Sequence, residues 1–282
     1  MRIVLRGRWL TTSVVQQIAQ IAGAGHIEPR DASSWRLVQF AAPLGMAQRA
    51  RIRAAADAAR ADANFIAQPR ALHSYRLAVM DMDSTLITIE CIDEIADMLG
   101  IKPEVSAITE AAMRGEIAYA ESLRQRVALL RGLDVAALER VYQERLQLSP
   151  GAERMLESFK AAGLKTLLVS GGFTFFTDKL KARLGLDYTH SNVLGIANGK
   201  LTGEVMGGIV DAEAKAEKLA ETCTQIGCAA SDAIAMGDGA NDLKMMAIAG
   251  LSVAYRAKPV VRAQAMTGLN HNGLDAVLDF FD

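Results

Sequence analysis

Two aspartates stand two residues apart where an apolar run ends. Asp81 and Asp83 come at the close of an expected strand over 75–81. Side chains two positions apart in a strand face the same way, so both carboxylates can address one point beyond the strand's carboxyl end. Open α/β sheets bind their ligands at that edge. The structural alternative is a pair of capping or turn aspartates before a helix.

The chemistry open to such a pair is phosphoryl transfer. Like charges this close repel, and the arrangement becomes favourable when a divalent cation and an electrophile lie between them. One carboxylate can then attack phosphorus as a covalent nucleophile. The other can protonate the leaving oxygen and later deprotonate water, provided that its surroundings raise its pKa.

A glycine-rich segment follows a second apolar strand. The expected strand 164–169 runs into Ser170, Gly171 and Gly172 before an expected helix over 174–184. A hydroxyl group and bare backbone N–H groups at a helix start can form a phosphate cradle. A simple glycine-rich turn is the alternative reading of this segment.

Further charged residues could complete the site. After an expected strand over 233–237, Asp238 and Asp242 would add oxygen ligands around a cation, and Mg²⁺ suits a few carboxylates with phosphate and water. Near the start of an expected helix, Lys215 could neutralise a transferring phosphoryl group. An ordinary surface lysine is the alternative, and Lys218 competes for the role.

These motifs occur in the order DMDST, VSGG, lysine and GDGAND, and together they resemble the haloacid dehalogenase superfamily of phosphohydrolases. The resemblance covers the chain from Tyr75 onward, about three-quarters of its length. It implies that Asp81 is the nucleophile and a Mg²⁺ ligand. It also implies that Asp83 is the general acid/base and gives its backbone carbonyl to the metal, while Asp238 binds the same ion.

The same resemblance assigns the phosphate-binding groups. It implies that Ser170 and Gly171 hold the phosphate, that Lys215 balances its charge, and that Asn241 and Asp242 complete the site. Because Asp83 is present, the resemblance is to the phosphatases rather than to the dehalogenases, which lack this second carboxylate.

The segments 81–100, 108–133 and 168–188 together are similar to the phosphoserine phosphatase family, its cap included. By this resemblance Glu90 receives the substrate's ammonium group and Arg126 its carboxylate, which arginine can bind with two hydrogen bonds. Arg124 and Arg131 flank Arg126, so the choice among them depends on the family match.

Two further cap residues enter by the same match. Met113 and Tyr119 correspond to apolar positions that line the family's cap, and packing within the cap is the alternative. Cys91 replaces the hydroxyl residue expected beside Glu90. The reaction implied is Mg²⁺-dependent hydrolysis of O-phospho-L-serine through an aspartyl phosphate, the final step of serine biosynthesis.

The alternation of short apolar strands with helices predicts an α/β fold with a doubly wound parallel sheet over 73–282. The stretch 90–148 is helical and too long for a simple crossover, so we expect an inserted helical cap there. The segment 197–205 reads as a hairpin.

Residues 1–72 predict a small N-terminal α+β domain that resembles the ACT-like domains attached to some phosphoserine phosphatases. Its expected elements are strands at 2–5 and 35–41 and helices at 11–23 and 46–64. The last of these is rich in Ala and Arg, and a solvated helix face is a simpler reading of it than an RNA-binding surface.

Composition narrows the partners of the chain. Its 282 residues carry a net charge of −1, which disfavours nucleic acid, and no apolar run is long enough to span a membrane. Three cysteines are an odd number, which indicates a reducing compartment and predicts a cytoplasmic protein. The expected partner is therefore a small molecule, phosphoserine, and a homodimer is left open.

Two rival functions are compatible with these motifs. The same chemistry could act on another small phosphate ester, or it could transfer the phosphoryl group to an alcohol instead of water. Alternatively, the phosphatase site could be vestigial and the N-terminal domain the working part.

Overall fold

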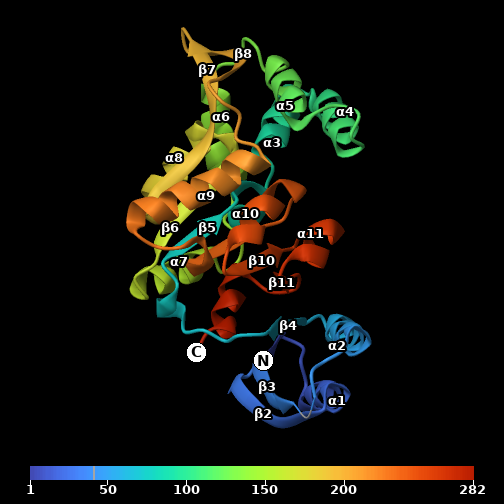
Figure 1. Ribbon diagram of the computed structural model, residues 1–282. Coiled ribbons are helices and arrows are strands. Elements are labelled where there is room, and N and C mark those ends of the chain that lie inside the picture. Colours follow the sequence, from blue (N-terminus) through green and yellow to red (C-terminus); the bar gives the residue numbers. More distant parts are fainter. Residues whose placement is uncertain (41) are drawn as a thin grey trace.

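The computed structural model describes residues 1–40 and 42–282, and within them the strands form two sheets (Figure 1). The smaller sheet is N-terminal and the larger one belongs to the rest of the chain. In this described part, no helix has the length and apolar character needed to cross a membrane.

The N-terminal unit is a βαββαβ motif with an antiparallel sheet in the order β2-β3-β1-β4. Its elements are β1 (Arg2–Arg6), α1 (Thr12–Ala22), β2 (Ala24–Asp31), β3 (Ser34–Phe40), α2 (Met46–Ala58) and β4 (Asp62–Ile66). Ile18 of α1 and Ile52 of α2 are fully buried against the sheet residues Ile3 and Leu37.

The predicted helix over 46–64 is wrong in its last part. The helix ends at Ala58, and Arg60 adopts a left-handed conformation with φ +50° that reverses the chain. Residues 62–66 then form β4, which pairs antiparallel with β1 and buries Phe65 and Ile66. The Ala/Arg pattern signals helix propensity, but pairing with a distant strand decides the conformation of these residues.

The larger sheet has the strand order β11-β10-β9-β5-β6-β7-β8, and its neighbours pair in parallel except β8 with β7. The strands are β5 (Leu77–Met80), β6 (Lys165–Phe173), β7 (Tyr188–Ala197), β8 (Lys200–Met206), β9 (Ala233–Gly237), β10 (Leu251–Tyr255) and β11 (Thr267–Leu269). The predicted hairpin is confirmed at β7–β8. It turns at Asn198 and Gly199, with φ +51° and +74°, as a tight two-residue loop requires.

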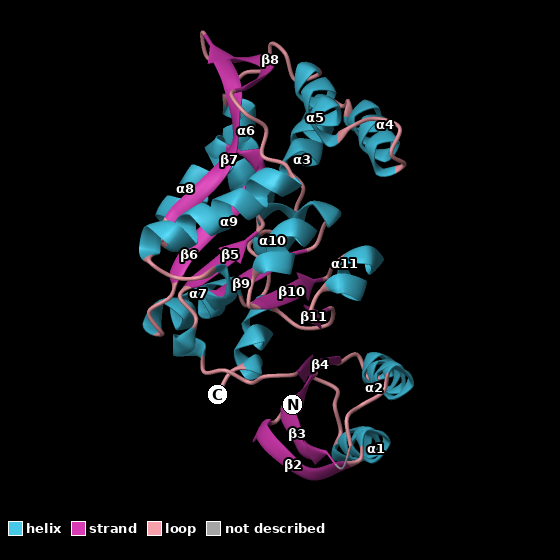
Figure 2. Cartoon of the chain, in the orientation of Figure 1, coloured by secondary structure: helices cyan, strands magenta, loops and turns pink. Residues whose placement is uncertain are grey.

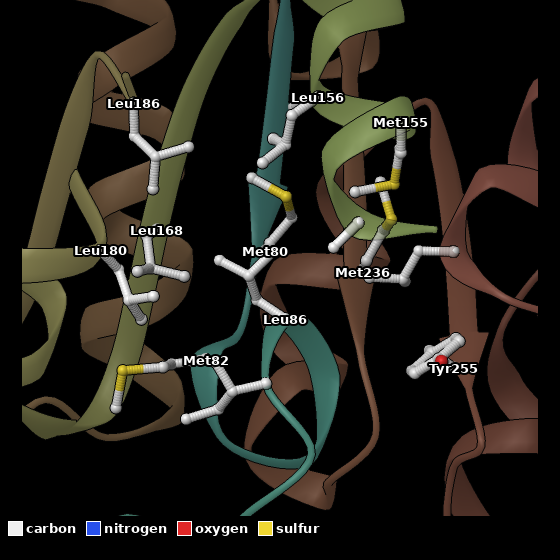
Figure 3. Close-up of a cluster of buried hydrophobic side chains, with 14 of the residues drawn as sticks. Met80, Met82, Leu86, Met155, Leu156, Leu168, Leu180, Leu186, Met236 and Tyr255 are labelled. Atoms are coloured by element: carbon white, nitrogen blue, oxygen red, sulfur yellow. The ribbon is translucent and has the colours of Figure 1, made fainter. Parts of the chain in front are cut away.

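Helices cover both faces of this sheet (Figure 2). Leu77 and Val79 of β5 point to the face covered by α9 (Ala212–Ile226) and α10 (Leu243–Ile248). Ala78 and Met80 point to the opposite face, covered by α7 (Ala152–Ala161) and α8 (Thr174–Leu184). Figure 3 shows Met80 and Met236 of the sheet beside Met155 and Leu156 of α7. The predicted doubly wound parallel sheet is confirmed.

Short helices fill the chain between β5 and α7. They include α3 (Cys91–Leu99), α4 (Lys102–Met113), α5 (Tyr119–Ala128) and α6 (Ala136–Arg140). Figure 1 shows α4 and α5 standing at one end of the larger sheet, beside the β7–β8 hairpin. This insertion is the helical cap, and it lies where the strands deliver their carboxyl ends.

The two sheets meet edge to edge through polar side chains. The Asn64 side chain of β4 donates to the Gly268 carbonyl at 3.0 Å and accepts from the Gly268 N–H at 2.7 Å. Asp62 accepts from the backbone N–H of Asn270 at 2.8 Å. Both side chains are about 3% exposed. These side-chain bonds join the edge strands β4 and β11 and fix the N-terminal unit in place.

Candidate active site

Two acidic segments converge at the carboxyl end of the larger sheet. β5 and β9 are neighbours, and the Asp81 N–H donates to the Met236 carbonyl at 3.0 Å. Among the described residues, Asp81, Asp238 and Asp242 form an acidic cluster in which one carboxylate oxygen from each lies within 4.8 Å of the others. The two acidic motifs therefore meet at the sheet edge where the sequence predicted them to meet.

Lys215 is fully buried inside this cluster. Its Nζ lies 2.8 Å from an Asp81 oxygen and 2.7 Å from an Asp242 oxygen. Lys218, its competitor in the sequence, instead pairs with Glu221 on the surface at 3.1 Å. The one lysine thus balances two buried carboxylates, as burial of like charges requires.

Asp242 has both of its oxygens engaged. One accepts from Lys215, and the other accepts from the N–H groups of Asp238 at 3.1 Å and Gly239 at 3.0 Å. Gly237 makes this approach possible, because a Cβ there would lie 2.2 Å from the Asp242 carboxylate. Asp242 therefore orients the loop that carries Asp238, and Asp81 and Asp238 are left with oxygens facing the cavity.

The electrostatics of the cluster favour a bound cation. Burial and the Asp242 charge raise the pKa of Asp238 to about 6, and the same two causes raise the pKa of Asp81, against the opposing effect of Lys215. These shifts measure the cost of gathering buried negative charge, which a divalent cation would relieve. The donor set, carboxylate oxygens from two strand ends, suits a hard cation such as Mg²⁺.

Asp83 lies in the turn after β5. Its carboxylate accepts from the Cys91 N–H at 3.3 Å, at the start of α3. Burial and the nearby Glu90 carboxylate raise the pKa of Asp83 to about 7. This side chain can therefore hold a proton near neutral pH and release it, as a general acid/base must.

A cavity of about 630 Å³ opens above the cluster, between the sheet edge and the cap. Ser170 and Gly171 line it, and Asn192 donates to the Gly171 carbonyl at 2.8 Å, which fixes this segment. The helix α8 begins only at Thr174, because β6 extends through Phe173. The predicted cradle thus lies on a strand end rather than on the first turn of a helix.

The cap side of the cavity carries opposite charges. Glu90 and Arg126 both line it, and Glu90 accepts from the Ser84 hydroxyl at 2.6 Å. Of the flanking arginines, Arg124 is exposed and Arg131 lies 3.8 Å from Glu204. Arg126 is the arginine of the three that reaches the cavity. The side chain of Met113 lies outside the described residues.

Tyr119 of α5 reaches across to the sheet. A Cβ on Gly171 would lie 2.2 Å from the Tyr119 hydroxyl oxygen, so the phenol occupies the space that this glycine leaves. Burial raises the pKa of Tyr119, which keeps its hydroxyl protonated. The cap and the cradle are therefore in contact at this point.

The cavity also contains residues that the sequence reasoning missed. Asn241 lines it as expected, but so do Ser122 and Lys258. The Lys258 N–H donates to the Asp238 carbonyl at 3.0 Å, three residues after β10 ends. The strand-end rule applied to β10 would have found Lys258, whereas Ser122 has no comparable signal in the sequence.

Known proteins resemble the chain in sequence and in structure. A family model described as haloacid dehalogenase-like hydrolase matches residues 78–247. A phosphoserine phosphatase of Polaromonas sp. is 61% identical over 213 residues, which cover 74% of this chain and 90% of the relative.

Two solved structures extend the comparison. A crystal structure of a haloacid dehalogenase-family hydrolase from Salmonella enterica serovar Typhi has a TM-score of 0.91 at 32% identity, over 100% of this chain and 98% of that one. A phospho-aspartyl intermediate analogue of a phosphoserine phosphatase has a TM-score of 0.69 at 38% identity, over 74% and 99%. The chain therefore belongs to the haloacid dehalogenase-like hydrolases and, within them, to the phosphoserine phosphatase family.

Proposed function

We propose that this protein hydrolyses O-phospho-L-serine to L-serine and phosphate, the final step of serine biosynthesis. The observation that carries the proposal is that the two sides of one cavity carry different groups. Its sheet side holds the carboxylate cluster and the cradle, and its cap side holds Glu90 and Arg126. An amino acid ester of phosphate needs a charge partner for its ammonium group, one for its carboxylate and a site for its phosphate.

In the proposed mechanism Asp81 attacks phosphorus in line with the departing serine oxygen. Lys215 holds one oxygen of Asp81, which orients the other for attack. Asp83 gives its proton to the leaving oxygen and then takes one from the water that cleaves the aspartyl phosphate. Ser170 and Gly171 hold the phosphoryl oxygens throughout. The cap excludes other water from the cavity.

We assign the cation site to Asp81, Asp238 and the backbone carbonyl of Asp83, with Mg²⁺ as the ion. When bound, Mg²⁺ supplies charge neutralisation for the phosphoryl oxygens. Asp242 and Lys215 orient these ligands without binding the ion. Three free cysteines, Cys91, Cys223 and Cys228, suit a cytoplasmic location.

We further propose that residues 73–282 carry the catalytic machinery, with the cap at 90–148 selecting the substrate. Residues 1–72 form the attached domain, and a homodimer of the chain is also proposed. The polar edge-to-edge junction at Asn64 and Gly268 supports a fixed attachment of this domain.

The direct test is phosphate release from phosphoserine with and without EDTA. We expect turnover that stops with EDTA and returns with added Mg²⁺. A panel containing phosphothreonine and other small phosphate esters, with and without serine as acceptor, measures selectivity and transfer. Faster turnover of an ester that lacks the amino acid group would contradict the proposed substrate.

Arg126→Ala should raise the KM for phosphoserine by about 100-fold or more, because the substrate carboxylate loses a charged, two-bond partner. The KM for p-nitrophenyl phosphate should change little, since this ester has no carboxylate. Arg124→Ala, on the exposed side of the same helix, is the matched control. Equal losses on both esters would remove the assignment of Arg126.

Gly171→Ala should lower kcat/KM by about 100-fold, because the new Cβ displaces the Tyr119 hydroxyl and with it the cap. The next nearest cap atom, Tyr119 Cζ, lies at 3.4 Å from that position. Adding Tyr119→Phe to Gly171→Ala should therefore restore most of the activity. If the double variant is no better than Gly171→Ala, the loss arises within the cradle itself.

Mg²⁺ should stabilise the protein more at about pH 8 than at about pH 5. Asp238 and Asp83 have raised pKa values of about 6 and about 7, so between pH 4 and 7 the metal-free folded state binds more protons than the unfolded chain. The stability contributed by these groups is therefore full at low pH and is lost as pH rises through 6 to 7. At the higher pH a bound cation takes the place of these protons, so Mg²⁺ has its larger stabilising effect there.

Thermal melting with Mg²⁺ and with EDTA at the two pH values measures this difference. Asp238→Asn is the control, and it should show a reduced Mg²⁺ effect at both. A Mg²⁺ effect as large at the lower pH as at the higher one would argue against these carboxylates as the cation site.

A further inference from the structure

We propose that the hydroxyl of Ser122 donates a hydrogen bond to the substrate carboxylate beside Arg126, as a further determinant of substrate specificity. The proposal deepens the function proposed above and rests on it. Ser122 lies on α5 and lines the active-site cavity.

The first observation is a buried hydroxyl without a partner. Ser122 is 1% exposed, and its Oγ finds no hydrogen-bond partner among the residues that the structure describes. A buried polar group in this state is costly and is usually satisfied by a protein group, a water or a ligand. Because this one lines a cavity, a ligand in that cavity can supply the missing partner.

The second observation is a contrast with other helices of the same protein. A helical serine or threonine commonly donates to the carbonyl four residues earlier. Thr109, Ser158 and Thr222 do so, at 3.1, 2.9 and 2.8 Å. The corresponding carbonyl of Ser122 is that of Ala118, which, among the residues that the structure describes, accepts only the backbone N–H of Ser122, at 2.9 Å. The Ser122 hydroxyl thus keeps an unused donor.

The position of Ser122 on α5 places it near the carboxylate end of the substrate. Tyr119, Ser122 and Arg126 follow one face of α5 at helical spacing, and all line the cavity. Tyr119 adjoins Gly171 of the cradle, whereas the Arg126 Nε lies 3.4 Å from the Ser122 carbonyl oxygen. A carboxylate held by Arg126 has lone pairs to spare, and Ser122 lies one turn away on the same face.

The test compares Ser122→Ala with the full-length wild type on phosphoserine and on phosphoethanolamine. The second ester keeps the phosphate and the ammonium group but lacks the carboxylate. We expect the KM for phosphoserine to rise by about tenfold or more with kcat little changed, as for loss of a hydrogen bond to a charged group. The KM for phosphoethanolamine should stay the same. Gln125→Ala, exposed on the same helix, should alter neither KM.

A measurement without substrate separates binding from packing. Removing an unpaired buried hydroxyl should raise the melting temperature of Ser122→Ala or leave it unchanged. A lowered melting temperature with equal losses on both esters would show a structural role and overturn the proposal. An unchanged KM for phosphoserine would overturn it as well, by showing that the hydroxyl turns to the Ala118 carbonyl.

Failure of the proposed function gives a different result. In that case the wild type itself turns over phosphoethanolamine or p-nitrophenyl phosphate but not phosphoserine. The assignment of Ser122 to the substrate carboxylate falls with it. Wild-type turnover of phosphoserine with an unaltered Ser122→Ala KM rejects only the role of Ser122.

Discussion

Asp81→Asn should lower kcat for phosphoserine by about 10⁴-fold or more while the protein stays folded. The amide has the shape of the carboxylate but cannot attack phosphorus, and loss of a nucleophile has an effect of this order. The fold should tolerate the change because it removes one of two buried negative charges, and Lys215 keeps its 2.7 Å contact with Asp242. Initial rates at saturating phosphoserine, with circular dichroism of the variant, measure both effects.

The matched control is Asp178→Asn, an exposed carboxylate on α8, which should keep wild-type activity. Acid quenching during turnover should also trap a phosphorylated protein in the wild type and none in Asp81→Asn. A variant that retained kcat within tenfold of the wild type would rule out Asp81 as the nucleophile.

Lys215→Met should abolish measurable turnover and destabilise the metal-free protein by about 3–5 kcal/mol, the usual effect of removing one partner from a buried ionic group. Lys215 is fully buried between Asp81 and Asp242, so its loss leaves two carboxylates without a countercharge. Methionine keeps most of the side-chain volume, which limits the effect of packing. Urea unfolding in EDTA measures the free energy of unfolding.

Two further variants assign the cause of this loss. Lys218→Met changes a lysine on the same helix that pairs on the surface, and it should cost less than 1 kcal/mol. Adding Asp242→Asn to Lys215→Met should recover part of the stability, because one unpaired charge is removed. A Lys215→Met protein as stable as the wild type would mean that the carboxylates are protonated without the lysine at no cost.

The sequence by itself determined where the acidic groups meet. Alternating apolar strands and helices require a parallel sheet covered on both faces, and parallel strands deliver their carboxyl ends to one edge. Asp81 and Asp238 each follow such a strand, and β5 and β9 are neighbours in the structure. This part of the site follows from local periodicity, which the sequence contains in full.

The tertiary structure decided which of several locally similar residues enter the site. Nothing local separates Lys215 from Lys218, or Arg126 from Arg124 and Arg131, apart from a family match, because each choice depends on how a helix is rotated against the sheet.

Contacts between distant parts of the chain decided the remaining features. Residues 62–66 form a strand through pairing with β1, the Tyr119 hydroxyl fills the space above Gly171, and Ser122 is buried. Local propensity cannot predict such contacts, since they depend on surfaces that exist only after the chain has folded.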